Sequence, residues 1–235
     1  MTNPGRAALP PPERLVINFH GLGPVPAGVD PAELRYWCAE DRFGAMLDTV
    51  GPLAEAAGLP IDITFDDGNL SDLHIALPAL AARQLKATFF VCAGRIGQAG
   101  YLDRPALREL HAAGMTVGSH GWRHADWRRC DERALELETR GALQELAAAI
   151  GCAVDQVGVP FGSYDRRVLA QLRRSGVRTV FTSDGGRASR GAWLVPRLSY
   201  TTHWTDATLP EAAMGSEGLV ARVRRRCVRA LKQLR

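Results

Sequence analysis

Short apolar runs alternate with longer amphipathic stretches along most of this 235-residue chain. The apolar runs are typical of strands in length and pattern, and they lie near residues 14–20, 60–66, 86–92, 115–119, 155–160, 177–182 and 193–199. The stretches between them have helical spacing and lie near residues 41–57, 71–84, 104–113, 132–150 and 164–175. Strands that alternate with helices form a parallel sheet with right-handed crossovers, so we predict an α/β fold.

Polar residues follow several of these strands directly, beginning with Asp66 and Asp67. An apolar strand ends at Phe65 and is followed at once by these two carboxylates and Gly68. A strand sends successive side chains to opposite faces, so both carboxylates can reach one site only where the pleat breaks. Gly68 permits such a break. A helix cap beside an exposed turn residue is an equally common use of an Asp pair.

Two histidines, His120 and His124, follow the strand near residues 115–119. Four residues apart, they share a face if the segment is helical, with about 5–6 Å between their Cβ atoms. Parallel strands end at a common edge of the sheet, where α/β folds build their sites, so these histidines can meet the Asp pair. Two imidazoles and one carboxylate leave coordination positions open, as in catalytic zinc sites. A hydrogen-bonded buried histidine is the commoner alternative for a single such residue.

Three segments together resemble the polysaccharide deacetylases of carbohydrate esterase family 4, the NodB homology domain. They are T-F-D-D-G at residues 64–68, S-H-G-W-R-H at 119–124 and V-G-V-P-F-G-S-Y at 157–164, within a similarity over residues 14–200. The resemblance implies an incomplete or distorted (β/α) barrel of about seven parallel strands. It also implies that Asp67, His120 and His124 hold a divalent ion, which we expect to be Zn²⁺, with Co²⁺ and Ni²⁺ as alternatives. Asp66 would be the general base.

The third segment departs from the family pattern. Most members carry an arginine two residues before the proline of this segment, where it holds the catalytic Asp, and this chain has Gly158 there. Arg197 can supply the guanidinium from the next strand, although a surface arginine after a turn proline is an equal alternative. The resemblance also implies that a backbone N–H near Phe161 or Gly162 binds the oxyanion.

The general acid is a second departure. In the family, an apolar strand near the end of the domain finishes in a histidine that protonates the leaving amine, and no such strand closes this chain. The first strand, however, finishes in His20. The first and last strands of a closed barrel are neighbours, so we predict that His20 takes this role by permutation. His203 is the alternative acid.

Aromatic side chains near these segments are candidates for stacking on sugar rings. Together with Gly162, the candidate substrate contacts are Trp37, Trp122, Phe161 and Tyr164. Each aromatic residue is equally suited to packing in the core.

The C-terminal region carries the excess positive charge. Seven of the 29 basic residues lie between residues 218 and 235, which leaves 22 basic residues against 25 acidic ones in the rest. Apolar residues recur there at helical spacing, so we predict a basic amphipathic helix. Two interpretations remain open: a weak peripheral contact of residues 219–235 with an anionic membrane, or a helix packed on the barrel with its basic face in solvent. No nucleic-acid-binding module is recognisable.

Composition and length favour one enzyme domain. Hydrophobic residues make up 46% of the chain and charged residues 23%, which is typical of globular proteins. We predict a flexible segment over residues 1–13, a catalytic domain over 14–205 and the basic helix within 206–235. Five cysteines without C-x-x-C pairing, and no recognisable signal peptide, favour a cytoplasmic protein, in one interpretation at the inner membrane face.

These features predict a metal-dependent hydrolase that removes N-acetyl groups from amino sugars of a polysaccharide or its biosynthetic intermediate. The substrate would be an N-acetylated glycan or a lipid-linked sugar. The alternatives are hydrolysis of another amide, such as a formamide or a ureide, at the same site, and a non-catalytic glycan-binding protein with a degenerate site.

Overall fold

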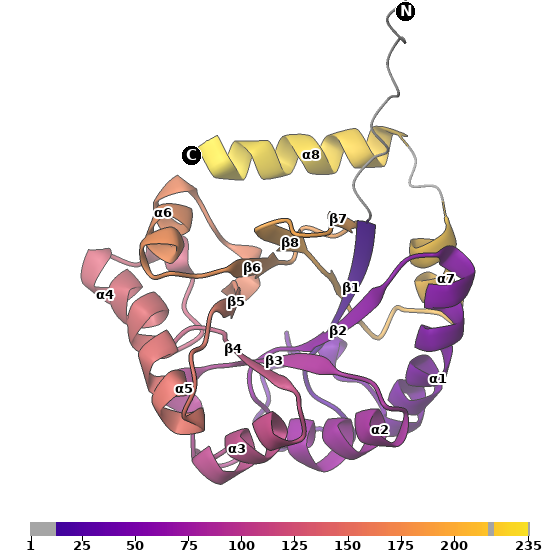
Figure 1. The fold of residues 1–235 in the computed structure, drawn as a ribbon, viewed down its shortest axis with the longest axis horizontal. Coiled ribbons are helices and arrows are strands. Elements are labelled where there is room, and N and C mark those ends of the chain that lie inside the picture. The colour runs from indigo at the N-terminus through magenta and orange to yellow at the C-terminus, as the bar shows by residue number, and fades with distance from the viewer. Residues whose placement is uncertain (1–12, 216–218, 235) are drawn as a thin grey trace, which may run out of the picture.

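Parallel strands alternate with helices and curl into a barrel in the computed structural model, which describes residues 13–215 and 219–234 (Figure 1). The strands are β1 (Glu13–Phe19), β2 (Ile61–Phe65), β3 (Ala87–Val91), β4 (Thr116–Ser119), β5 (Gln156–Gly158), β6 (Thr179–Thr182), β7 (Ala188–Ser189), β8 (Leu194–Pro196) and β9 (Leu198–Ser199). The predicted α/β barrel is therefore confirmed. The segment predicted to be flexible, residues 1–13, lies outside the described residues except for Glu13.

Helices form the outer layer of the barrel (Figure 1). They are α1 (Glu40–Ala57), α2 (Leu77–Ala82), α3 (Arg104–Ala112), α4 (Glu132–Glu136), α5 (Ala142–Ile150), α6 (Arg166–Arg174), α7 (Thr208–Met214) and α8 (Leu219–Leu234). Two predicted helices contain a π-helical turn, at Asp72–Ala76 before α2 and at Leu137–Gly141 between α4 and α5. Helix α7 was not predicted.

The sheet closes through one divided segment. The strand order is β7-β1-β2-β3-β4-β5-β6-β8, and β9 pairs in parallel with β1. The strand predicted over residues 193–199 is therefore split at Arg197: its first half pairs with β6 and its second half with β1. The first strand is thus a neighbour of the last, as the permutation argument requires.

Successive side chains of β1 and β2 point alternately to the core between sheet and helices and to the inside of the barrel. Ile17 and Phe65 belong to the large core between the sheet and the helices, whereas Val16 belongs to a small cluster inside the barrel. Because strand side chains alternate with a period of two, Asn18 and Thr64 also face the inside of the barrel. This inner face leads to the ends of the strands, where the functional side chains lie.

Helix α8 lies against the side of the barrel formed by β6, β7 and β8 (Figure 1). Arg225, Arg229 and Lys232 lie on one side of the helix and are half-buried, whereas Leu231 and Leu234 are exposed. Among the described side chains, the helix packs through these three basic residues, whereas Arg224 is exposed. The interpretation that placed the basic face in solvent is corrected for Arg225, Arg229 and Lys232. Side chains at 219–222 and at 226 lie outside the description.

Candidate metal and catalytic site

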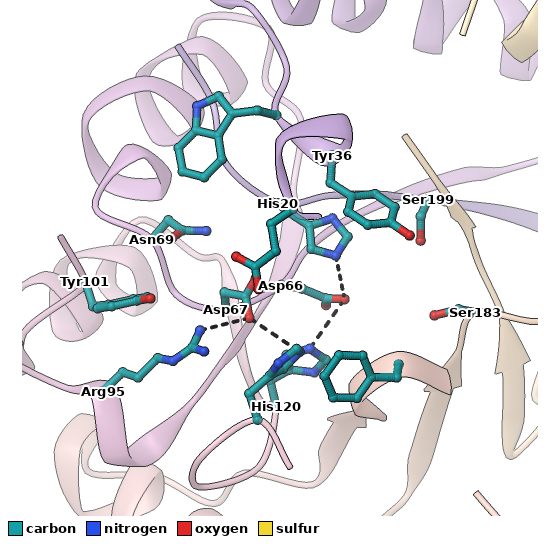
Figure 2. A pocket seen from close by; sticks show the side chains of 14 residues that line it. His20, Tyr36, Asp66, Asp67, Asn69, Arg95, Tyr101, His120, Ser183 and Ser199 are labelled. Atoms are coloured by element: carbon teal, nitrogen blue, oxygen red, sulfur yellow. Dashed lines mark hydrogen bonds and ion pairs between the residues drawn. The ribbon is translucent and has the colours of Figure 1, made fainter. Parts of the chain in front are cut away.

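A cavity opens where β1, β2, β3 and β4 end (Figure 2). Its lining combines acidic, basic and aromatic side chains. These are His20, Glu33, Tyr36, Trp37, Asp66, Asp67, Asn69, Arg95, Tyr101, His120, His124, Phe161, Ser183 and Ser199. The structure therefore brings the Asp pair, the His pair and His20 into one place.

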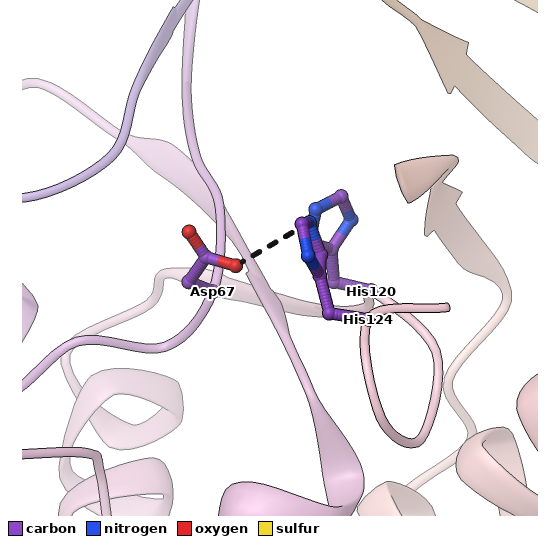
Figure 3. A group of neighbouring side chains, drawn as sticks. All are labelled: Asp67, His120 and His124. Atoms are coloured by element: carbon purple, nitrogen blue, oxygen red, sulfur yellow. Dashed lines mark ion pairs between the residues drawn. The ribbon is translucent and has the colours of Figure 1, made fainter. Parts of the chain in front are cut away.

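Asp67, His120 and His124 form a compact group of ligand atoms (Figure 3). One carboxylate oxygen and one nitrogen of each ring lie within 4.8 Å of one another. Asp67 reaches this group because its φ of 78° breaks the pleat immediately after β2. Gly68, with φ of 75°, continues the break as predicted. Two nitrogens and one oxygen fit a tetrahedral divalent ion with one position left open.

The two histidines meet through a loop and not through the helix considered for this segment. His124 follows a turn and has a φ of 58°. The buried Glu138 carboxylate shapes this loop by accepting the N–H groups of Trp122 (2.9 Å) and Arg123 (3.0 Å). A Cβ at Gly121, where the family usually has Ser or Thr, would lie 2.5 Å from the Glu138 carboxylate. The glycine is therefore required by the carboxylate beneath it.

His120 is oriented by a backbone carbonyl. Its Nδ1 lies 2.8 Å from the carbonyl oxygen of Gly158, which directs Nε2 toward Asp67 and His124. Such outer partners select the tautomer of metal-binding histidines. Burial lowers the pKa of His120 to about 4, so the ring is neutral at neutral pH. A neutral imidazole is the form that binds metal ions.

Asp66 is held by a buried polar network. Arg197 donates to both carboxylate oxygens, at 2.7 and 2.8 Å, and Asn18 donates at 2.9 Å. Thr64 and Arg197 both donate to the Asn18 side-chain oxygen, each at 2.7 Å. Burial would raise the pKa of Asp66, but the Arg197 guanidinium outweighs it and holds the pKa well below its usual range. Asp66 is therefore a carboxylate at neutral pH.

The position of Arg197 accounts for Gly158. A Cβ at residue 158 would lie 3.0 Å from the Phe90 ring and 3.2 Å from Nδ1 of His120. A side chain at this position would require Phe90 or His120 to shift. The Arg197 guanidinium lies over the Phe90 ring, with its Cζ atom 5.2 Å from the ring centroid. It reaches Asp66 from the segment that closes the barrel.

His20 and His203 lie in different environments. His20 lines the cavity, stacks on Tyr36 and places Nε2 3.8 Å from a carboxylate oxygen of Asp66 (Figure 2). His203 is exposed in a turn and does not line the cavity. The structure therefore brings only the first of the two candidate acids to the Asp pair.

The predicted substrate contacts divide in the same way. Trp37 and Phe161 line the cavity, whereas Trp122 and Tyr164 do not. Tyr164 is fully buried and donates to Asp184. The Gly162 N–H donates to the Val159 carbonyl at 3.0 Å, which leaves the Phe161 N–H as the remaining oxyanion donor of the predicted pair.

Arg95 was missed by sequence reasoning, although a signal for it exists. It follows β3, just as the Asp pair follows β2 and His120 follows β4. The strand-end argument therefore applies to Arg95 as well. Tyr36 and Tyr101 also line the cavity and were not predicted, because they lie in the irregular connections after β1 and β3. Ser199 ends β9, within the strand predicted over residues 193–199, but its place in the lining was not predicted.

Comparison with known proteins connects this geometry to one family. The family model described as polysaccharide deacetylase matches residues 55–180. A chitin deacetylase from Pestalotiopsis sp is 26% identical over 133 residues, or 56% of this chain and 44% of that protein. The Bacillus subtilis protein YxkH, which carries a provisional polysaccharide deacetylase name, is 25% identical over 128 residues, or 54% of this chain and 46% of that protein. The chain thus spans about half the length of these relatives.

Solved structures share the fold over most of the chain. The Streptococcus pyogenes deacetylase PplD in complex with acetate has a TM-score of 0.75 at 19% identity, and the match covers 87% of this chain and 99% of that one. IcaB from Ammonifex degensii has a TM-score of 0.70 at 23% identity, with 88% and 98% covered.

Proposed function

Because the chain belongs to the polysaccharide deacetylase family, we propose that it is a metal-dependent hydrolase that removes N-acetyl groups from amino sugars. The substrate is a polysaccharide or its biosynthetic intermediate. One observation carries the proposal: Asp67, His120 and His124 offer three ligand atoms within 4.8 Å, directly beside Asp66, a second carboxylate clamped by Arg197.

Asp67, His120 and His124 would hold the ion, which we propose to be zinc. The chemistry that a divalent ion supplies in such a site is Lewis acidity toward a carbonyl oxygen and toward water. The neutral ring of His120 binds without first losing a proton, because its pKa is about 4. Its carbonyl partner, Gly158, keeps the ring aligned while substrate enters and leaves.

Asp66 takes the proton from the attacking water as general base, and His20 gives a proton to the departing amine. Arg197 and Asn18 fix the carboxylate with Oδ2 3.7 Å from Nε2 of His120 and 3.8 Å from Nε2 of His20. Arg197 lowers the pKa of Asp66 and so makes it a weaker base; a divalent ion held beside it would supply a lower pKa of water, which would offset this loss. The Phe161 N–H stabilises the oxyanion of the tetrahedral intermediate. Trp37 and Phe161 present aromatic surface to the sugar.

Elemental analysis of purified variants, combined with an acetate-release assay on N-acetylated glycans, tests the assignment. Asp67→Asn, His120→Ala and His124→Ala should each lose most of the bound zinc and the activity. Asp66→Asn should keep the zinc and lose turnover by roughly 10²- to 10⁴-fold, the usual worth of a general base. His74→Ala is the matched control, since His74 is exposed and does not line the cavity.

Two outcomes would contradict the proposal. Loss of zinc from Asp66→Asn, to the same degree as from Asp67→Asn, would overturn the division of roles. Release of formate or of a ureide product, with no acetate from any N-acetylated glycan, would move the activity to another amide on the same site.

We also propose a peripheral membrane contact for α8. Its outward side exposes Val223 (49%), Leu231 (54%) and Leu234 (78%), with the exposed Arg224 beside them. Apolar residues flanked by arginines suit the interface of an anionic bilayer. Among the described residues, no helix is long and apolar enough to cross a membrane.

Flotation with anionic and neutral vesicles tests this contact. Binding should require anionic lipid, weaken as salt rises and fall sharply in the Leu231→Ser, Leu234→Ser double variant. The same binding by the double variant would place the contact elsewhere. The absence of binding at any salt concentration would remove the membrane proposal and leave the deacetylase proposal unaffected.

A further inference from the structure

Arg95 lies in the cavity and has no part in the reaction described above. It ends the 3₁₀ turn Ala93–Arg95 after β3, and its side chain is 23% exposed. One terminal nitrogen lies 3.1 Å from Oδ1 of Asp67, and the guanidinium stacks over the Tyr101 ring at 4.9 Å (Figure 2). Within residues 13–215 and 219–234, Asp67 is the only hydrogen-bonding partner of the Arg95 side chain.

Without a bound cation, the Arg95 guanidinium is paired with Asp67 and also feels the charge of the exposed Glu33 carboxylate. Asp66 and Arg197 already neutralise each other. A divalent ion on Asp67 and the two histidines therefore leaves the Arg95 guanidinium beside an uncompensated positive charge. The other carboxylate of the lining, Glu33, is exposed. A metal-loaded cavity is thus positive on the side where Arg95 lies.

The surroundings of Arg95 hold it ready for a ligand. Tyr101 supports the guanidinium from one face, which limits its rotation. Asn69 and Tyr101 form an isolated antiparallel bridge, so the backbone that carries these neighbours is fixed. The Asn69 amide and the Tyr101 hydroxyl lie beside Arg95 in the same wall of the cavity (Figure 2). A planar guanidinium with free N–H groups binds carboxylate and phosphate oxygens in pairs.

We propose that Arg95 binds an anionic group, a carboxylate or a phosphate, that the substrate carries close to its acylamino group. The enzyme then selects acidic amino sugars over neutral ones. The inference rests on the proposed deacetylase function and specifies its substrate class. Tyr36, Trp37, Tyr101 and Phe161 supply aromatic surface to the lining. Arg95 adds a charged contact that an acidic sugar can use and a neutral sugar cannot.

Paired substrates test this selectivity. The substrates are short N-acetylated glycans that differ only in one substituent near the acylamino group: a hydroxyl, a carboxylate or a phosphate. The wild-type protein should have a higher kcat/KM for the acidic members of the set. Arg95→Gln should lower the acidic-to-neutral ratio of kcat/KM at least tenfold, and Arg95→Lys, which keeps the charge but not the fork, should fall between. The carboxylate and phosphate arms identify which anion the site prefers.

Glu33→Gln is the matched control, because it removes the opposite charge from the same cavity. It should raise the acidic-to-neutral ratio. If Arg95→Gln lowers kcat/KM equally for neutral and acidic substrates, Arg95 only orients Asp67 and the inference is wrong.

A binding measurement separates this inference from the proposed function. Isothermal titration of zinc-loaded protein with the same acidic and neutral glycans needs no turnover. Tighter binding of the acidic glycans, lost in Arg95→Gln, supports the anion site even if no acetate is released. Equal binding of both glycans by the wild-type protein overturns it, whatever the assay of acetate release finds.

Discussion

The guanidinium beside Asp66 comes from a different position in the sequence than in most of the family. Arg197 holds Asp66 across a separation of 131 residues, from the segment that closes the barrel. Sequence reasoning proposed this arginine but weighed a surface position equally, because nothing local to Pro196 and Arg197 indicates burial. Its position is set by the closing segment, which divides between β6 and β1 at Arg197 and brings the guanidinium to Asp66. The residues next to Arg197 in the sequence do not indicate this contact, which follows from the closure of the barrel.

His20 provides a test at the scale of one residue. We expect His20→Ala to lower kcat by roughly 10²- to 10⁴-fold, the usual worth of a general acid, while metal content and fold are kept. An activated acetyl ester should suffer less, since its leaving group needs little protonation. His203→Ala should have a small effect, because His203 is exposed and outside the cavity. A large loss in His203→Ala and none in His20→Ala would reverse the assignment.

Burial of His120 makes the stability of the metal-free protein depend on pH. Its pKa falls from about 6.5 in the unfolded chain to about 4 in the folded one. Between these values the unfolded state binds more protons, so the free energy of unfolding decreases as the pH falls from about 6.5 to 4, by about 3 kcal/mol. Urea unfolding with chelator present should show this slope. His120→Asn should flatten it, and an unchanged slope in that variant would assign the effect to another group.

Among the elements, α8 contacts the turn beside the cavity through Lys232. Lys232 bonds the Asp184 carboxylate at 2.6 Å and the Gly162 carbonyl at 3.0 Å. Asp184 also accepts from Tyr164 (2.7 Å) and Thr182 (2.9 Å). Gly162 directly follows Phe161, which lines the cavity. The helix is therefore tied to the turn that carries the candidate oxyanion donor.

Removing this connection should affect both stability and turnover. We expect Lys232→Ala to lower the free energy of unfolding by about 1–3 kcal/mol, because Asp184 loses its charged partner in a largely buried position. It should also lower kcat more than it raises KM, since the turn at Phe161 becomes less ordered. Arg224→Ala, an exposed position on the same helix, is the control. If Lys232 acts only on stability, Lys232→Ala will be less stable but will keep its kcat at a temperature where it is folded. Lys232→Arg should restore most of the turnover.

Periodicity predicted the strands and helices of the barrel, and it failed where packing decides. Apolar residues at helical spacing indicated a helix at the C-terminal end, and α8 lies there, but its orientation could not be predicted. Apolar residues usually face a core, but Leu231 and Leu234 face outward. The opposite side of the helix faces the barrel, where Lys232 donates to Asp184 and to the Gly162 carbonyl. The loop between His120 and His124 was unpredictable for a similar reason, since the distant Glu138 shapes it.

At the scale of the whole molecule, barrel closure explains why a strand-end argument located the site. Parallel strands end at one edge of the sheet, so Asp67 after β2 and His120 after β4 meet without any long loop. The pairing of β1 with β9 brings His20 and Arg197 to the same edge from opposite ends of the chain. Both groups were within reach of prediction because the topology of a barrel leaves few alternatives.

From the closing contact we predict an order of events during folding. The three candidate ligands lie within residues 67–124, whereas the hydrogen bond between Asn18 and Arg197 spans 179 residues. Contacts between distant parts of a chain form slowly, since a long loop must close before they are made. In refolding from urea with zinc present, metal uptake should therefore precede the return of hydrolysis. Until its two ends meet, a newly made chain would hold the ion without a clamped base, and so would not yet hydrolyse amides.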